Sequence, residues 1–141
     1  MEDGYSRRRH CVYKLTYYVV FVVKYRRPVI TEEIGAFILK RSRELLEGWN
    51  GNLLEGGFEP DHVHLLIGMD PSHELSKYIS AMKQRISREV RENFPEQIER
   101  YLWGGGLWTP SFFITTTGGA PLEKIREYVA GQGNEPQPKK H

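Results

Sequence analysis

The segment DHVHLLI, residues 61–67, decides the fold that we predict for this chain. Residues two apart on a β-strand point to the same face of a sheet, so His62 and His64 share one face. The apolar residues that alternate with them share the other face, which predicts packing beneath helices. The two imidazoles are therefore expected on the sheet face that points away from this packing.

Outward from this strand, the sequence predicts alternating strands and helices. The segment YKLTYYVVFVVKY carries β-branched and aromatic residues on both alternating sets, which is typical of a central strand covered on both faces. Apolar residues at helical spacing predict three helices. In chain order, the expected elements are a strand at 13–25, a helix from 31 to about 49, strands at 52–58 and 62–69, a helix with an apolar stripe from Leu75 to Val90, a strand at 111–117 and a helix from 121 to about 132.

The order β-α-β-β-α-β-α predicts an α+β fold. It matches a ferredoxin-like (RRM-like) β-α-β-β-α-β core with an antiparallel sheet and helices on one face, plus a C-terminal helix. A chain of 141 residues fits one domain. We expect a basic N-terminal arm at 1–12, the folded domain at 13–132 and a polar, solvated tail at 133–141. The free face of the sheet is where we expect the chemistry.

Composition excludes several classes of protein. With 20 Lys+Arg against 18 Asp+Glu the net charge is only +2, so a basic surface for nucleic acid must be local. The single cysteine, Cys11, cannot form an intramolecular disulfide, and no N-terminal segment resembles a signal peptide, so we expect a cytoplasmic protein. The longest apolar run, near residues 19–23, is far shorter than the roughly 20 residues that span a bilayer, so we expect no membrane partner.

Two pairs of polar residues are candidates for a catalytic site. The neutral imidazoles of His62 and His64 suit a divalent metal, although such a pair also occurs in surface or packing roles. Tyr128 and Gln132 lie four apart in the last predicted helix and therefore share a face. A phenol can attack a phosphodiester when a metal polarises the phosphate, and Gln132 offers an oxygen ligand. The alternative is a half-buried tyrosine beside an exposed amide.

Several segments together resemble the single-tyrosine HUH transposases of small bacterial and archaeal insertion sequences. They are DHVHLLI, WGGGLWTPSFFITTTGGAPLEKI (residues 103–125) and REYVAGQ (residues 126–132). The segment KYRRPVI, which follows the first predicted strand, is also similar to this family. The resemblance covers about residues 12–132 and keeps the family's motif order.

This resemblance implies a mechanism and a set of partners. It implies that His62, His64 and Gln132 bind a divalent metal, Mg²⁺ or Mn²⁺, and that Tyr128 attacks a scissile phosphate. The products are a 5′-phosphotyrosine link and a free 3′-hydroxyl, and a 3′-hydroxyl that attacks this link rejoins the DNA without a nucleotide cofactor. The implied partners are single-stranded DNA with imperfect hairpins and a second subunit, in a homodimer where one tyrosine helix can complete the other subunit's histidine site.

Basic and aromatic residues indicate where DNA could bind. Cations of the helix from Leu75 gather near one face and could track phosphates, but the interspersed Glu89 and Glu92 are also typical of a solvated face. The candidate DNA contacts are Arg26, Arg27, Lys77, Lys83, Arg85, Arg88 and Arg91, while Arg7 to Arg9 belong to the predicted arm. Trp103 and Trp108 flank a glycine-rich loop and could stack on unpaired bases, although we expect at least one of them in the core.

Three other functions are compatible with the sequence. A domesticated relative would still cut single strands at palindromic repeats but would no longer move its own gene. A ferredoxin-like sheet also describes a non-enzymatic nucleic-acid-binding module, but the K/R-G-F/Y-G/A-F-V-x-F/Y signature of RNA recognition is absent. In a metal-dependent phosphoesterase, water would attack and Tyr128 would only position the substrate. DNA ends linked to protein distinguish the transposase from this last alternative.

Overall fold

The computed structural model describes residues 6–8, 11–13, 15–70, 74–116, 122–133 and 135–140, with backbone alone for 6–8, 11–13 and 122–125. Its centre is a four-stranded antiparallel sheet with the strand order β4-β5-β3-β6. The strands are β3 (Leu15–Val22), β4 (Asn52–Glu59), β5 (His62–Met69) and β6 (Phe113–Thr116). This order confirms the predicted ferredoxin-like core.

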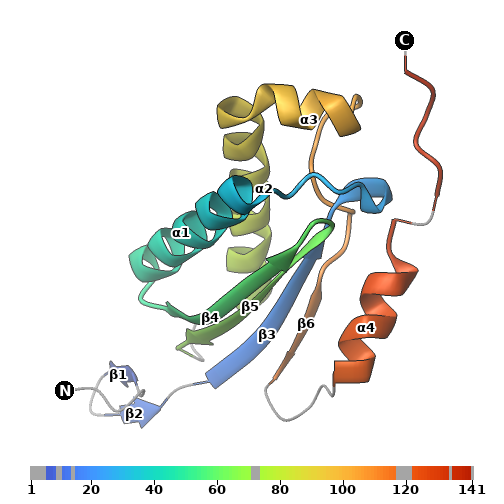
Figure 1. Cartoon of the computed structure of the whole chain (residues 1–141). Coiled ribbons are helices and arrows are strands. Elements are labelled where there is room, and N and C mark those ends of the chain that lie inside the picture. The colour runs from blue at the N-terminus through green and yellow to red at the C-terminus, as the bar shows by residue number, and fades with distance from the viewer. Residues whose placement is uncertain are drawn as a thin grey trace.

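Helices cover both faces of this sheet (Figure 1). The two long helices α1 (Glu32–Gly48) and α2 (Leu75–Asn93) lie over one face, and α4 (Leu122–Gly131) lies on the other side, near β6. The side chain of Thr31 caps α1 by accepting a hydrogen bond from the backbone N–H of Ile34 at 3.1 Å. Among the described helices, none is both long and apolar enough to span a membrane.

The central strand β3 contributes to two separate apolar clusters. Val19 and Phe21 belong to the main core, which fills the space between the sheet, α1 and α2. Val20 and Val22 are fully buried on the opposite face, where they pack with Val129 of α4. The sequence predicted a strand covered on both faces, and this prediction is confirmed.

The end of β3 differs from the prediction, because the strand was expected to continue to residue 25. It ends at Val22 and is followed by a single 3-10 turn, η1 (Lys24–Arg26). Tyr25 and Arg26 adopt φ angles of 57° and 53°, in the left-handed region that residues other than glycine rarely occupy. This turn aims the side chain of Arg26 at the loop before β5, which is important for the site described below.

The structure also contains two short features that the sequence did not predict. Within the predicted N-terminal arm, β1 (Ser6–Arg8) pairs with β2 (Cys11–Tyr13) as a small antiparallel ribbon, too short to show a periodic pattern. A short helix, α3 (Pro95–Tyr101), follows α2 and was not predicted. Pro95 occupies its first turn, a position where proline favours the start of a helix.

Candidate functional site

The histidine pair lies on β5, on the same side of the sheet as α4. His62 is aligned with Val22 of β3, and His64 with Val20. Aligned residues of antiparallel strands share a face, so both imidazoles project to the side where these valines contact α4. The ring centroids lie 6.1 Å apart, and Val63 between them is fully buried on the opposite face. The orientation expected from the alternating sequence is therefore present.

A glycine on the neighbouring strand makes room for the ring of His64. Gly57 of β4 is aligned with His64. A Cβ atom at this position would lie 2.6 Å from Cε1 and 2.7 Å from Nε2 of the imidazole, closer than real Cβ contacts come. The preceding Gly56 faces the other side, where a Cβ would meet the side chain of Leu39 on α1. The imidazole of His64 thus occupies space that any side chain at 57 would fill.

Asp61 orients the other histidine. Nδ1 of His62 lies 2.9 Å from Oδ1 of Asp61, and because a carboxylate only accepts, Nδ1 carries the proton. Nε2 of His62 then keeps its lone pair. Histidines that bind metals commonly donate their second N–H to a carboxylate in this way, which fixes the tautomer and raises the basicity of the ligand atom. The geometry of the Asp61–His62 pair therefore fits metal binding.

The electrostatics of the pair also fit a metal, although two imidazoles do not complete a site. Burial lowers the pKa of His64, and the neighbouring His62 lowers it further, so the ring of His64 stays neutral at pH 7. Neutral imidazole is the form that binds metals. Within the part of the chain that the structure describes, no three His, Cys, Asp or Glu side chains gather to hold a metal ion. Among the described residues, an amide oxygen such as that of Gln132 is a further type of group that can bind a divalent metal.

Ser111 joins the two residues that the sequence singled out near the C-terminus. Its Oγ donates a hydrogen bond to Oε1 of Gln132 at 3.0 Å and lies 3.1 Å from the hydroxyl of Tyr128. Because the one proton of Ser111 is used on Gln132, the hydroxyl of Tyr128 is the donor in the second bond. Tyr128 and Gln132 share a face as predicted, and a serine from another segment bridges them.

The segment before β6 positions Ser111. The backbone N–H of Thr109 donates to the carbonyl of Val22 at 2.7 Å, so this segment first runs along the end of β3. Pro110 has no N–H to continue the pairing. The Nζ of Lys83 on α2 donates to the carbonyls of Pro110 and Ser111 at 2.9 and 3.2 Å. Backbone and side-chain contacts therefore fix the loop that presents Ser111 to α4.

The hydroxyl of Tyr128 is a protonated phenol at neutral pH. Burial raises its pKa above the ordinary value of 10.0, while hydrogen bonds with Ser111 and Thr109 oppose this shift. Its ring packs on Phe113 with centroids 5.3 Å apart. A tyrosine in this environment needs activation before it can act as a nucleophile.

We expect the ionisation of Tyr128 to have a midpoint above pH 10, as measured by the difference in ultraviolet absorbance between the wild type and Tyr128→Phe during an alkaline titration. The native state keeps the phenolic proton longer than the unfolded state, so stability from this group falls as pH rises through and beyond 10. Ser111→Ala should raise the midpoint further, because it removes the hydroxyl that can turn its proton from Gln132 to the phenolate and so lowers the pKa of Tyr128. A midpoint below 10 would contradict this account.

Arg26 links the histidine pair to the tyrosine helix. Its Nε lies 3.4 Å from Oδ2 of Asp61, the carboxylate that orients His62. Its Nη1 donates to the backbone carbonyl of Ala130 in α4 at 3.3 Å. A continuous set of contacts therefore runs from His62 through Asp61 and Arg26 to the helix that carries Tyr128.

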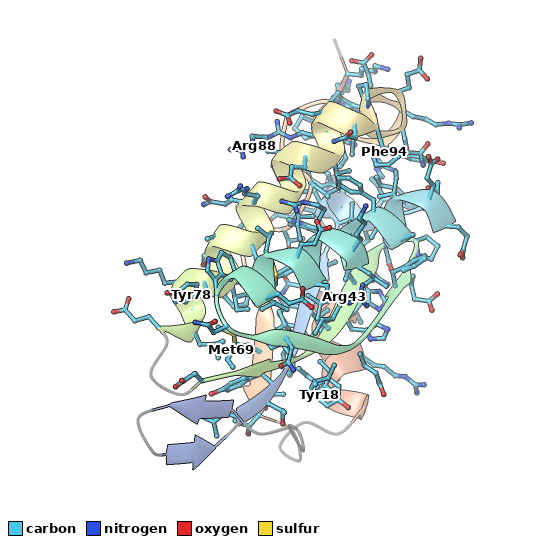
Figure 2. The ribbon with its side chains drawn as sticks, turned by 90° about the vertical axis from the view of Figure 1, so that its left-hand side faces the viewer. Tyr18, Arg43, Met69, Tyr78, Arg88 and Phe94 are labelled. Carbon is cyan, nitrogen blue, oxygen red and sulfur yellow. The ribbon has the colours of Figure 1, made fainter. Side chains whose placement is uncertain are left out.

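The seven candidate DNA-binding cations have different surroundings. Three of them pair with carboxylates: Arg26 with Asp61, Lys77 with Glu74 and Arg85 with Glu89. The Nε atom of Arg27 is buried and has no hydrogen-bond partner among the described residues, and Arg88 is exposed on α2 (Figure 2). Lys83 and Arg91 line a groove beside α2. Only part of the predicted set therefore shares one surface.

The two tryptophans beside the glycine-rich loop, Trp103 and Trp108, and part of the predicted tail make specific contacts with the folded domain. Trp108 is only 5% exposed, which confirms that at least one tryptophan belongs to the core. Trp103 donates from Nε1 to the carbonyl of Pro138 at 2.7 Å. The side chain of Gln137 accepts from the backbone N–H of Trp103 and donates to the carbonyl of Tyr101. Part of the tail that was expected to be solvated therefore packs on the loop after α3.

Sequence reasoning did not find three residues of this site. Asp61 had a signal, because it directly precedes the histidine pair. Gly57 had none, because its role depends on the register between β4 and β5. Ser111 also had none, since an exposed serine after a proline is common and its partners are 17 and 21 residues away in the sequence.

Comparisons with known proteins point to one family. A family model described as "Transposase IS200 like" matches residues 11–132. The ISDra2 transposase TnpA of Deinococcus radiodurans is 31% identical over 127 residues, 90% of each chain. The transposase for insertion sequence element IS200 of Salmonella typhimurium is 27% identical over 123 residues, which are 87% of this chain and 80% of that protein.

Solved structures agree with these sequence matches. A crystal structure assigned to a transposase of Deinococcus radiodurans R1 superposes with a TM-score of 0.81 at 30% identity, covering 90% of this chain and 97% of the other. A REP-associated tyrosine transposase, in complex with a REP hairpin, superposes with a TM-score of 0.52 at 13% identity, covering 88% of this chain and 68% of the other. This second match shows a shared fold.

Proposed function

Because the chain belongs to the IS200-like transposase family, it is a DNA transposase, and we propose that it cuts and rejoins single-stranded DNA through a covalent bond to Tyr128. One observation carries this proposal: Ser111 holds the hydroxyl of Tyr128 beside the amide oxygen of Gln132. The helix α4 packs on the same sheet face that carries the two histidines. A nucleophile and candidate metal ligands thus face one side of the sheet.

The proposed reaction is a transesterification. The hydroxyl oxygen of Tyr128 forms a bond to phosphorus, the bond from phosphorus to the 3′ oxygen breaks, and a proton is returned to that oxygen by way of solvent. The products are a 5′-phosphotyrosine link and a free 3′-hydroxyl. A second 3′-hydroxyl attacks the link, releases Tyr128 and rejoins the strand. Phosphodiester bonds are exchanged one for one, so no nucleotide cofactor is needed.

The proposed cofactor is a divalent cation, Mg²⁺ or Mn²⁺. His62, His64 and Gln132 would hold it, in keeping with the oriented tautomer of His62 and the neutral ring of His64. When bound, the cation would polarise the scissile phosphate. Oε1 of Gln132 accepts a hydrogen bond from Ser111, and its second lone pair would be available to the cation.

Gly57→Ala is expected to weaken Mn²⁺ binding about 10- to 100-fold, the range typical when the support of a metal ligand is disturbed. The added methyl group would occupy the place of the His64 imidazole and displace the ring. Calorimetric titration with Mn²⁺ measures the effect. Gly56→Ala is the matched control, because its methyl group meets the movable end of Leu39 on the opposite face. Equal Mn²⁺ affinity in both variants would remove His64 from the metal site.

The proposed DNA partner carries a hairpin, and the proposed active assembly is a homodimer. A transposase of the same fold has been determined in complex with a REP hairpin, which supports a hairpin substrate here. In the proposed dimer, α4 of one subunit completes the histidine site of the other. Within one chain, Gln132 accepts a hydrogen bond from Ser111. We propose that this contact belongs to the free subunit and changes when the shared histidine site forms in the dimer.

The experiment that tests the proposal is incubation with end-labelled single-stranded DNA bearing candidate hairpin ends, in the presence of Mn²⁺. Denaturing gels detect cleavage, and mass spectrometry of digested protein locates any covalent adduct. We expect one strand covalently attached at Tyr128 and loss of the adduct with a chelator. Cleavage that leaves free 5′-phosphate ends would favour a phosphoesterase, and hairpin binding without any product would favour a binding module.

The products do not separate a mobile element from a domesticated relative, because both would attach the strand to Tyr128. Gene context separates them. A mobile copy should lie between hairpin-bearing ends, whereas a domesticated copy should lie outside such a pair.

A further inference from the structure

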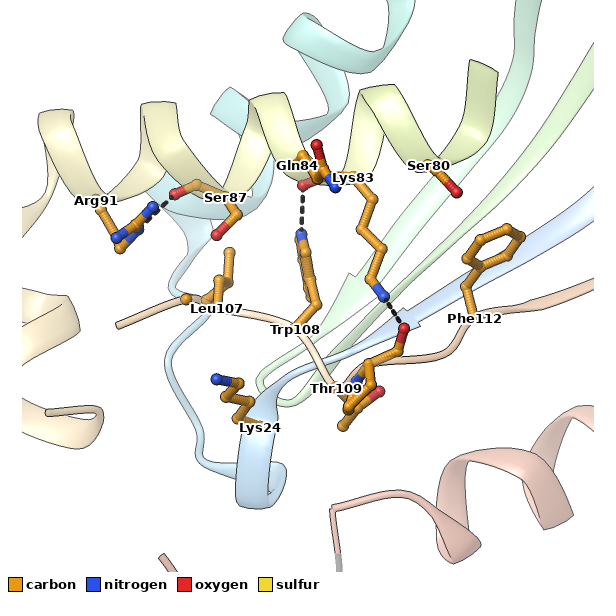
Figure 3. Close-up of a pocket in the computed structure, with 12 residues that line it drawn as sticks. Lys24, Ser80, Lys83, Gln84, Ser87, Arg91, Leu107, Trp108, Thr109 and Phe112 are labelled. Atoms are coloured by element: carbon orange, nitrogen blue, oxygen red, sulfur yellow. Dashed lines mark hydrogen bonds between the residues drawn. The ribbon is translucent and has the colours of Figure 1, made fainter. Parts of the chain in front are cut away.

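A groove of about 440 Å³ lies between α2 and the segment that precedes β6 (Figure 3). Its volume is within the range of about 300–1,000 Å³ that small-molecule sites occupy, so it suits a nucleotide unit. Twelve described residues line it: Lys24, Ser80, Lys83, Gln84, Ser87, Arg91, Gly106, Leu107, Trp108, Thr109, Pro110 and Phe112. Three of these side chains are cationic, and none of the twelve is a carboxylate.

The three cations are held by neutral carbonyl groups. Lys83 donates to the carbonyls of Pro110 and Ser111, and Nζ of Lys24 donates to the carbonyl of Gly105 at 3.2 Å. Nε of Arg91 lies 3.4 Å from the carbonyl of Ser87. These bonds orient the side chains without neutralising them, and burial lowers the pKa of Lys83, which reflects the cost of holding this charge away from water. An anion in the groove would offset that cost.

Elsewhere on the two long helices, several cations pair with carboxylates. Arg41 forms ion pairs with Glu44 and Glu89, both at 2.6 Å, and Arg85 also contacts Glu89. The groove therefore differs from the mixed-charge face of the same helix. Its charge is complementary to a phosphate backbone.

An aromatic ring and polar side chains complete the groove. Phe112 lines one end and is half-buried, and Nζ of Lys83 lies 5.7 Å from its ring centre. Ser80 and Gln84 present hydrogen-bonding groups from α2 (Figure 3). A cation beside an aromatic ring is the combination that single-strand-binding proteins use for a phosphate and its unpaired base.

The groove is directly connected to the candidate catalytic residues. Thr109, Pro110 and Phe112 line it, and Ser111 between them contacts Tyr128 and Gln132. Lys83 links the groove to Ser111, because it lines the groove and its Nζ donates to the carbonyl of Ser111. The loop that lines the groove is therefore also the loop that contacts Tyr128.

We propose that the groove binds a phosphate and an unpaired base of the single DNA strand next to the position that is cut. The phosphate contacts Lys24, Lys83 and Arg91, and the base lies against Phe112. This inference rests on the proposed function, since it places the same substrate. It adds a subsite that sets which stretch of single strand approaches Tyr128.

The test measures binding of a fluorescent single-stranded oligonucleotide, and of the same sequence as a duplex, to the full chain without added metal over a range of salt concentrations. Lys24→Gln and Arg91→Gln should each weaken single-strand binding several-fold and reduce the salt slope by about 1, the loss of one phosphate contact. Phe112→Leu should weaken it roughly 5- to 100-fold. Arg43→Gln is the charge-matched control, because Arg43 is exposed on α1 (Figure 2), which does not line the groove.

Two results would overturn the inference. One is wild-type affinity in Lys24→Gln and Arg91→Gln, and the other is an equal loss of single-strand and duplex binding in Phe112→Leu, which would exclude an unpaired base on that ring. Failure of the proposed function is distinguishable. If no adduct forms at Tyr128 but the groove variants still lose single-strand affinity, the subsite stands without the covalent mechanism. If the adduct forms and these variants bind normally, the subsite is rejected alone.

Discussion

Replacement of Tyr128 by phenylalanine is expected to abolish the covalent protein–DNA adduct and to lower strand cleavage by at least about 10³-fold, since removal of a nucleophile has effects of this size or larger. Phenylalanine keeps the ring that packs on Phe113 and removes only the hydroxyl that contacts Ser111. The cost in folding stability should stay near 1 kcal/mol, the net contribution of one hydrogen bond. Single-turnover cleavage of labelled single-stranded DNA measures the rate.

Tyr78→Phe is the matched control for this variant. Tyr78 lies on α2, where its ring packs against Trp49 with centroids 4.9 Å apart, on the sheet face opposite to α4. Its loss of a hydroxyl should leave cleavage within about twofold of wild type. If Tyr128→Phe still cleaved at the wild-type rate, the attacking group would be water or another residue, and the phosphoesterase interpretation would replace the transposition chemistry proposed here.

His64→Ala is expected to lower Mn²⁺-dependent cleavage by more than about 100-fold, because even disturbing the groups that support a metal ligand costs 10- to 100-fold. The imidazole sits at the centre of the sheet on the side of α4, and no other described side chain of the His, Cys, Asp or Glu type completes a set of three there. Metal binding by calorimetry and cleavage on gels should fall together. Asp61→Asn, which only weakens the orientation of His62, should cause a smaller loss.

The control for His64→Ala is binding of single-stranded DNA without metal, which should not change. A His64→Ala protein that cleaves normally at saturating Mn²⁺ would show that the pair supports the fold without taking part in the reaction.

Local periodicity was sufficient to predict much of this architecture. The alternation around His62 and His64 predicted which face each side chain takes, because a strand has a period of two whatever its neighbours are. The double-sided apolar pattern of β3 predicted that both faces would be covered. Helical spacing placed Tyr128 and Gln132 together. These features depend on residues that are close in the sequence.

Features that depend on tertiary contacts were not predictable. Arg26 stays a candidate for phosphate contact, but its contacts with Asp61 and the carbonyl of Ala130, which are 35 and 104 residues away, could not be predicted. The left-handed backbone conformation occurs at Tyr25 and Arg26, which are not glycines, so the sequence does not indicate it. The packing of Gln137 on the loop after α3 likewise depends on where the chain returns after α4. Patterns within one sequence do not show which distant residues come into contact.

The division of the apolar interior into two clusters has a consequence for how the protein opens. Among the described residues, the main core holds twenty buried side chains, whereas the cluster beneath α4 holds three. Free energies of local opening in a native protein range from near zero up to that of complete unfolding, and elements with little buried apolar area lie at the lower end. Within the described residues, α4 has the smaller set of buried apolar contacts, and we expect it to open more readily than the sheet, α1 and α2. Mutations in the small cluster are expected to change mainly how often α4 leaves the sheet, whereas mutations in the main core are expected to change the free energy of complete unfolding.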